Sequence, residues 1–259
     1  MLLGVNIDHI AVLREAREIN DPNPLDALGI VQRAGGDQIT IHLREDRRHI
    51  QDEDAKLITK LSPLPVNIEC AIAPSVTKIV RDLNPNRVTL VPEKREEVTT
   101  EGGLDLDKNY EKIKQSIDYF QEKNIELSLF IDPKIEYVKA SKELGAEWIE
   151  LHTGLYSNIY AMLYSNLRQT HHCIKALELD KNELSLLLVK SLNEIKECAI
   201  MAKKLGLKVA AGHGLNYQNV KNIAKIDEIE ELNIGQSIVA RSVFNGLEEA
   251  VKTMKSLIS

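Results

Sequence analysis

The sequence predicts an α/β fold, a (β/α)8 TIM barrel with extra helices, mainly between strands 6 and 7. Eight short apolar runs rich in β-branched residues alternate with amphipathic helical patterns. Strands separated by crossover helices run parallel, and parallel strands need both faces covered. A length of 259 residues is typical of one such barrel. We therefore expect a single TIM-barrel domain over residues 1–259.

The predicted strands are apolar runs bounded by turn or polar residues. In chain order they are Leu2–Ile7, Gln38–His42, Val66–Glu69, Arg87–Leu90, Glu126–Phe130, Trp148–Leu151, Lys208–Ala211 and Glu230–Ile234. Gly35, Gly145 and Gly206 each precede a strand, where a left-handed helix cap is expected. A doubly wound open sheet is the main alternative. Such a sheet usually has a Gly-x-Gly-x-x-Gly turn after its first strand, and here that turn reads Asn-Ile-Asp-His.

Amphipathic patterns between the strands predict helices. They cover Leu25–Ala34, Asp54–Leu61, Ser75–Leu83, Tyr110–Lys123 and Lys134–Leu144. The connection Val91–Leu106 is too long for a plain turn, and we expect a lid or binding loop there. Before the seventh strand, Asn158–Ala176 and Asn182–Leu205 both have helical patterns. These two segments predict the extra helices outside the barrel.

The composition excludes several classes of protein. A hydrophobic fraction of 43% with 28% charged residues is typical of a soluble globular protein. A net charge of −6 gives no general basic field for nucleic acid, so an anionic substrate has to be held locally. The sequence has no apolar run of membrane-spanning length and no signal peptide pattern. Its three cysteines lack a Cys-x-x-Cys spacing, which fits a reducing compartment. We expect a cytoplasmic protein without nucleic-acid or membrane partners.

Polar and ionisable residues gather at the predicted carboxyl ends of the strands, the rim that carries the chemistry in barrels of this kind. They are Asn6, Asp8, His9, His42, Arg44, Glu69, Glu150, His152, His213, Asn233 and Gln236. For any one of them taken alone, a hydrogen-bonded structural role is the more common explanation. Their joint placement on one rim predicts a functional site.

Three of these residues are candidates for proton transfer. Histidine exchanges protons near neutral pH, and glutamate does so where burial raises its pKa. His42, Glu69 and His213 come from separate predicted strands and so could surround a substrate. A metal site is the alternative explanation for many His and acidic residues. The sequence has no His-x-His pair on the first strand and no His-Glu-x-x-His helix, and we expect no metal.

Arginines and glycines predict two anion sites. Arg44 lies two residues beyond His42 and is the strongest candidate for a clamp, because its planar fork suits phosphate. Gly214 and Gly235 allow a ligand to approach the backbone, and Gly235 is expected to open the last helix, whose first amides favour an anion. Two anion sites suggest two phosphates. The predicted strand ends carry no lysine, which disfavours an enzyme-bound Schiff base.

Several long blocks, in order along the chain, resemble one known family. They are Gly4–Ile10, His42–Ile50, Val91–Arg95, Val98–Gly103, Glu150–Gly154, Ala211–Leu215 and Glu231–Gly235. Together they resemble the pyridoxine 5′-phosphate synthase family over nearly the whole chain. The resemblance implies a ring-forming transferase of vitamin B6 biosynthesis. Such an enzyme condenses 1-deoxy-D-xylulose 5-phosphate with 3-amino-2-oxopropyl phosphate to pyridoxine 5′-phosphate, inorganic phosphate and water. The resemblance also implies no metal or organic cofactor and a homo-octamer.

The resemblance assigns a role to each matching residue. It implies that His42 and Glu69 are proton acceptors, that His213 is a proton donor and that Glu150 stabilises a transition state. Contacts to the deoxyxylulose phosphate are implied for Asp8, His9, Arg44, His49 and Thr99. Contacts to the amino ketone phosphate are implied for Asn6, Arg17, Gly214, Gly235 and Gln236.

The chain departs from the family pattern at two places. Gln236 stands where the family often has histidine, and Leu155–Gly206 is longer than usual. Two other function classes remain open. One is a metal-dependent barrel aldolase or hydrolase acting on a phosphorylated substrate, with His9, His42, Glu69 and His213 as ligands. The other is a catalytically inactive phosphate-binding barrel.

Overall fold

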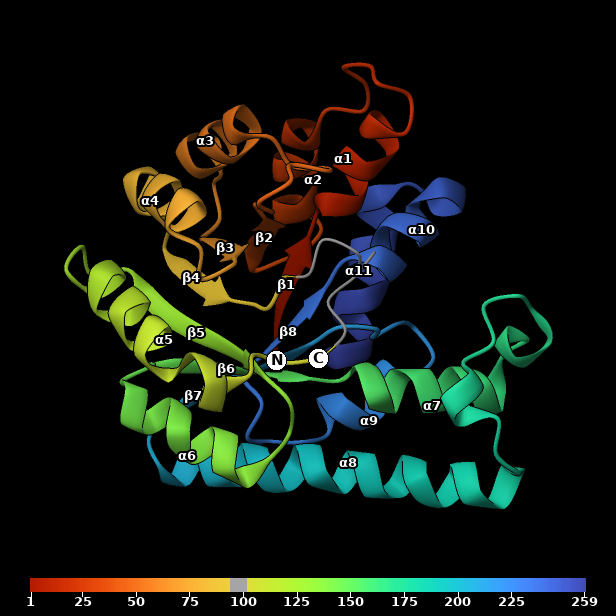
Figure 1. Ribbon diagram of the computed structural model, residues 1–259. Coiled ribbons are helices and arrows are strands. Elements are labelled where there is room, and N and C mark those ends of the chain that lie inside the picture. The colour runs from red at the N-terminus through yellow and green to blue at the C-terminus, as the bar shows by residue number, and fades with distance from the viewer. Residues whose placement is uncertain (94–101) are drawn as a thin grey trace.

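The computed structural model describes residues 1–93 and 102–259. Eight strands pair in chain order, all parallel, and β8 closes on β1 (Figure 1). They are β1 Leu2–Asn6, β2 Gln38–His42, β3 Val66–Cys70, β4 Arg87–Leu90, β5 Glu126–Ile131, β6 Trp148–His152, β7 Lys208–Gly212 and β8 Glu231–Ile234. Each strand boundary lies within one residue of the predicted one. The predicted barrel is confirmed.

Helices surround the barrel (Figure 1). They are α1 Asp8–Glu15, α2 Ala27–Arg33, α3 Asp52–Leu61, α4 Pro74–Leu83, α5 Leu106–Gln121, α6 Ile135–Leu144, α7 Gly154–Tyr164, α8 Lys181–Lys204, α9 Val220–Ala224, α10 Gln236–Asn245 and α11 Leu247–Ile258. Short 3-10 turns lie at Pro24–Asp26, Leu167–Gln169 and Lys175–Leu177. The long helix α8 packs against α6 and α7 outside the barrel, as the extra helices were expected to do. Gly35, Gly145 and Gly206 have the left-handed backbone that the predicted caps require.

Alternation along the strands separates an apolar outer face from a polar inner face. In β2, Ile39 and Ile41 are fully buried in the core under the helices. The side chains between them point the other way, because successive residues of a strand face opposite sides. Gln38 donates to Glu231 at 3.0 Å, and Thr40 donates to Asn233 at 3.2 Å. The interior of this barrel is therefore a hydrogen-bonded polar core.

One buried ion pair crosses that interior. Arg87 on β4 lies 2.8 Å from Glu231 on β8, and these strands are not neighbours in the barrel. The Arg87 guanidinium also lies 3.6 Å from the centre of the Trp148 ring. Buried charges are tolerated when they are paired and hydrogen-bonded, and these contacts meet that condition. The pair ties β4 to β8 below the rim.

The helix predicted over Asn158–Ala176 is wrong beyond Tyr164. Ser165 leaves the helical conformation, its hydroxyl donates to Ala161 O at 2.7 Å, and it accepts from Leu167 N at 3.1 Å. The bond from Leu167 N to the serine hydroxyl closes a local turn that competes with continuation of the helix. The chain beyond it is held instead by a small apolar cluster that includes Met162 and Leu184.

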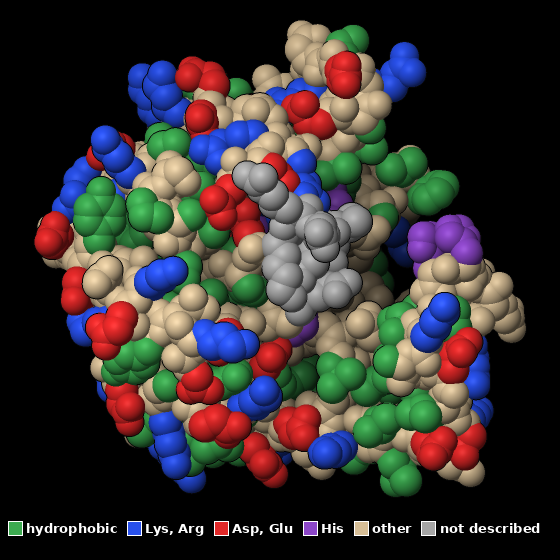
Figure 2. All heavy atoms as spheres, in the orientation of Figure 1, with side chains coloured by type: hydrophobic (Ala, Val, Ile, Leu, Met, Phe, Trp, Pro, Cys, Tyr) green, Lys and Arg blue, Asp and Glu red, His purple; other side chains and the backbone are tan. Residues whose placement is uncertain are grey.

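Gly235 opens α10 and not the last helix, because α11 follows it after Gly246. Half of the predicted lid or binding loop, residues 94–101 with Thr99, lies outside the described residues. Within residues 1–93 and 102–259, no helix is both long enough and apolar enough to cross a membrane. Acidic and basic side chains are interspersed over the face shown in Figure 2.

Candidate active site

A cavity of about 520 Å³ lies at the carboxyl ends of the strands. Parallel strands deliver all of these ends to the same rim, so residues far apart in sequence meet there. The predicted site residues that line the cavity are Asn6, Asp8, His9, His42, Arg44, His49, Glu69, Glu150, His213, Gly214, Gly235 and Gln236. Arg17 is exposed in the turn after α1 and does not line it. Thr99 lies outside the described part of the chain.

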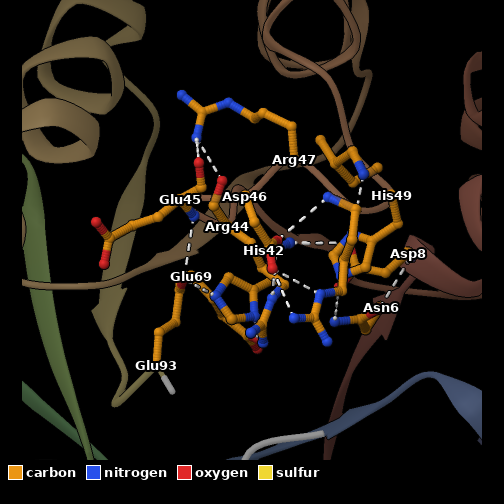
Figure 3. Close-up of polar contacts among 12 residues, drawn as sticks. Asn6, Asp8, His42, Arg44, Glu45, Asp46, Arg47, His49, Glu69 and Glu93 are labelled. Carbon is orange, nitrogen blue, oxygen red and sulfur yellow. Dashed lines mark hydrogen bonds and ion pairs between the residues drawn. The ribbon is translucent and has the colours of Figure 1, made fainter. Parts of the chain in front are cut away.

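His42 lies between two glutamates (Figure 3). Its Nε2 is 2.8 Å from Glu93 Oε1, and its Nδ1 is 3.8 Å from Glu69 Oε2. The first distance is that of a hydrogen bond and the second is too long for one. Burial, followed by the charges of Glu150 and Asp8, raises the pKa of Glu69 well above its usual value. Glu69 is therefore protonated more readily than an ordinary glutamate.

Asp8 joins the first two strands at the rim. Its Oδ1 accepts from the backbone N–H of His42 at 2.9 Å, and its Oδ2 accepts from the Asn6 amide at 3.0 Å. Asn6 Oδ1 in turn accepts from the Asp8 backbone N–H at 3.0 Å. This closed set of hydrogen bonds fixes the ends of β1 and β2 relative to each other (Figure 3).

Glu150 is a buried acid on β6. Its Oε2 accepts from the Asn233 amide at 2.7 Å. Burial raises the pKa of Glu150 to about 7, although the hydrogen bond from Asn233 acts in the opposite direction. A carboxyl group with a pKa near neutrality can both donate and accept a proton.

His213 follows β7 with a φ of 79°, a left-handed conformation that is uncommon for a residue with a side chain. The Thr153 hydroxyl lies 2.6 Å from His213 O and 2.7 Å from Gly212 O, which holds the turn. Burial, then the neighbouring His152 and His9, lowers the pKa of His213 to about 4. The ring is therefore neutral at physiological pH in the free protein.

His9 and His49 are also held in the neutral form. Burial is the main cause that lowers the pKa of each ring. His49 Nδ1 accepts from the Ile50 backbone N–H at 2.9 Å, which leaves Nε2 as its donor. His9 Nδ1 is buried and has no hydrogen-bond partner among the described residues. Both rings line the cavity and can exchange hydrogen bonds with a ligand.

Arg44, Gly214 and Gly235, the residues of the two predicted anion sites, all line the cavity. Arg44 is only 3% exposed, and its Nε lies 3.4 Å from Asp46 Oδ1. Gly214 has a φ of 76°, and a Cβ there would lie 2.7 Å from Ser157 Cβ. A Cβ on Gly235 would lie 2.8 Å from Asn6 Cβ. Gly214 therefore allows the turn after β7 to pack closely against α7, and Gly235 allows the chain after β8 to pack closely against the end of β1.

Three contacts were not predicted from the sequence. Glu93 binds His42, Asn233 binds Glu150, and His152 Nδ1 lies 3.2 Å from Asp132 Oδ1. Asn233 had a detectable signal, since it is a polar residue at an inward position of an apolar strand. Glu93 had only its place in the block Val91–Arg95, because it follows β4 in a connection rich in charged residues.

Within residues 1–93 and 102–259, no three or more His, Cys, Asp or Glu side chains are grouped to hold a metal ion. The fold and the cavity define a TIM-barrel protein with a cluster of titratable groups at its carboxyl rim. The family described as pyridoxal phosphate biosynthesis protein PdxJ matches residues 3–259. The chain belongs to this family, and the resemblance of the sequence blocks is confirmed.

Curated relatives match over their full length. The pyridoxine 5′-phosphate synthases of Aliarcobacter butzleri and Sulfurovum sp. are 67% and 64% identical over 258 residues, covering 100% of this chain and 99% and 100% of theirs. Among solved structures, the tryptophan synthase A-subunit of Pyrococcus furiosus has a TM-score of 0.57 at 12% identity, covering 98% of this chain and 97% of that chain. Phosphoribosylanthranilate isomerase of Thermotoga maritima has a TM-score of 0.55 at 12% identity, covering 100% and 98%. These distant structures share the fold alone.

Proposed function

We propose that the chain condenses 1-deoxy-D-xylulose 5-phosphate with 3-amino-2-oxopropyl phosphate to pyridoxine 5′-phosphate, releasing phosphate and water. The observation that carries the proposal is that His42, Glu69 and His213 line one cavity. Arg44 and the glycines after β7 and β8 line the same cavity. A condensation of this kind moves several protons and holds two phosphates, and the cavity provides groups of both kinds.

The protonation states of the free site indicate how the cycle begins. Burial shifts Glu69 toward its protonated form and His213 toward its neutral form. The amino ketone carries an ammonium group, which has to lose a proton before nitrogen can attack a ketone. We assign His213 to take this proton and to donate it later. Glu69 donates its proton to the carbonyl oxygen that leaves as water, and its carboxylate then accepts a proton from carbon.

The remaining residues serve the two substrates. Asp8, His9, Arg44, His49 and Thr99 are assigned to the deoxyxylulose phosphate, with the Arg44 fork on the phosphate that departs. Asn6, Arg17, Gly214, Gly235 and Gln236 are assigned to the amino ketone phosphate, which stays on the product. Glu150 is assigned to stabilise a transition state, because its pKa near 7 lets it share a proton with a developing oxyanion. His42 is assigned as a second proton acceptor.

Arg17 is exposed and does not line the cavity. Its assignment therefore requires a ligand that extends beyond the cavity. We further propose that the chain is a single TIM-barrel domain, acts in the cytoplasm and assembles as a homo-octamer. Light scattering of the purified protein tests the assembly. An eightfold mass supports it, and a monomer contradicts it.

Incubation of the purified chain with both phosphates, in the presence of a strong chelator, tests the proposed function. We expect the absorbance of pyridoxine 5′-phosphate to appear together with inorganic phosphate, and neither to appear when one substrate is omitted. Product that forms only after a divalent metal is added would support the metal-dependent class instead. Binding of both phosphates without any product would support an inactive phosphate-binding barrel.

A further inference from the structure

Glu93 holds the His42 ring from the side opposite Glu69 (Figure 3). The side chains of His42 and Glu93 are 7% and 5% exposed, so water does not compete strongly for their 2.8 Å contact. Glu93 Oε2 also accepts from the Glu45 backbone N–H at 3.0 Å. Both carboxylate oxygens are therefore engaged, and the carboxylate is fixed in orientation.

The two glutamates differ in how readily they ionise. Burial acts against ionisation of Glu93, but the hydrogen bond from His42, the Glu45 N–H and the charge of Arg44 hold the pKa of Glu93 below its usual value. Burial and neighbouring acids raise the pKa of Glu69 instead. The His42 ring thus faces a carboxyl group that favours ionisation at Nε2 and one that resists ionisation near Nδ1.

This asymmetry selects one tautomer of the ring. An ionised carboxylate only accepts hydrogen bonds, so His42 Nε2 has to carry the hydrogen in the contact with Glu93. The lone pair of a neutral ring then lies on Nδ1, the atom 3.8 Å from Glu69 Oε2. The other tautomer would place two acceptors 2.8 Å apart at Glu93. A fixed tautomer and ring orientation are what a third group supplies to a catalytic histidine in hydrolase triads.

We propose that Glu93 is a positioning residue for His42, which directs Nδ1 toward the substrate as the atom that accepts a proton. The proposal deepens the proposed function and rests on it. When Nδ1 takes a proton, the ring becomes a cation whose charge Glu93 balances at 2.8 Å. Glu93 does not line the cavity among the described residues, so it acts through His42 and not on the substrate.

A double-mutant cycle tests whether Glu93 acts through His42. Glu93→Gln keeps the shape of the side chain but leaves a single acceptor for two donors, the His42 ring and the Glu45 N–H. We expect Glu93→Gln to lower kcat by about 10- to 100-fold, with KM and product affinity little changed. Glu93→Ala should lower kcat by a larger factor. Glu53→Gln removes the same charge from an exposed position on α3 and serves as the matched control.

The decisive comparison is made in the His42→Asn background, by single-turnover measurement of product. In that background, Glu93→Gln should lower the rate of product formation by less than about threefold, because the ring that Glu93 orients is absent. If the rate losses of the two single variants multiply in the double variant, the positioning role is overturned. A normal kcat in Glu93→Gln would also overturn it. Product affinity verifies that each variant is folded. If the unchanged protein forms no pyridoxine 5′-phosphate, the proposed function itself fails, which is a separate outcome.

Discussion

Glu150 on β6 and Asn233 on β8 are joined by a hydrogen bond of 2.7 Å, although β7 lies between their strands. Gly212 on β7 makes this contact possible. A Cβ on Gly212 would lie 2.3 Å from Glu150 Oε1 and 3.3 Å from Asn233 Cβ. The absence of a side chain at one position of the barrel therefore lets two functional groups meet across a strand.

Gly212→Ala should break this contact. The added methyl group has to displace the Glu150 carboxyl group, and overpacking of a close-packed interior costs about 1–3 kcal/mol. We expect a loss of that size in the free energy of unfolding, measured by denaturant titration, and a lower turnover. Gly29→Ala is the control, because a Cβ there would meet only the flexible end of Arg33 at 3.2 Å. Equal stability of the two variants would contradict the packing argument.

Glu150→Gln should change how stability depends on pH. The pKa of Glu150 is raised from 4.5 to about 7, so between these values the folded state binds more protons than the unfolded state. The stability that protonated Glu150 contributes is fully present below pH 4.5 and is lost as pH rises through 7. Glutamine does not titrate and can still accept from Asn233. Relative to the unchanged protein, the free energy of unfolding of the variant should therefore rise by up to about 3 kcal/mol between pH 4.5 and 8. A difference that is independent of pH would contradict the assigned pKa.

Arg44→Ala and Gly235→Ala should separate the two anion sites. Arg44 is assigned to the phosphate that leaves, so its loss should lower turnover and deoxyxylulose phosphate binding while product affinity is retained. A methyl group on Gly235 would lie 2.8 Å from Asn6 Cβ and should weaken product binding at the start of α10. Titration of pyridoxine 5′-phosphate into both variants, with the exposed Arg33→Ala as control, measures this. Equal losses of product affinity would show that the sites are not separate.

The strands and the rim were predictable from local pattern. In β2, the alternation of Ile39 and Ile41 with polar residues defines both a strand and its faces, and His42 then falls at the strand end. Contacts that depend on barrel closure were not predictable. Arg87 meets Glu231 across 144 residues, and Glu93 meets His42 across 51 residues.

Other limits of the sequence have local causes. The helical pattern through Ser165 continues in apolar spacing, but the Ser165 hydroxyl accepts from Leu167 N and closes a turn where the helix stops. The position of Arg17 outside the cavity could not be read from its spacing after β1, because α1 carries it away from the rim. Glu69 and His213 were predictable as site residues, whereas their protonation states depend on burial that only the folded structure shows.

The central claim is that proton transfer at the rim, and by Glu69 in particular, carries the reaction. Glu69→Gln tests it most directly, because glutamine keeps the shape and the neutral charge of the protonated acid but transfers no proton. Turnover by the unchanged protein, Glu69→Gln and the exposed control Glu53→Gln is compared with the affinity of each for pyridoxine 5′-phosphate. The account predicts that turnover of Glu69→Gln falls by about 10²-fold or more while product affinity is retained. Near-normal turnover, or a loss of product affinity as large as the loss of turnover, would contradict it.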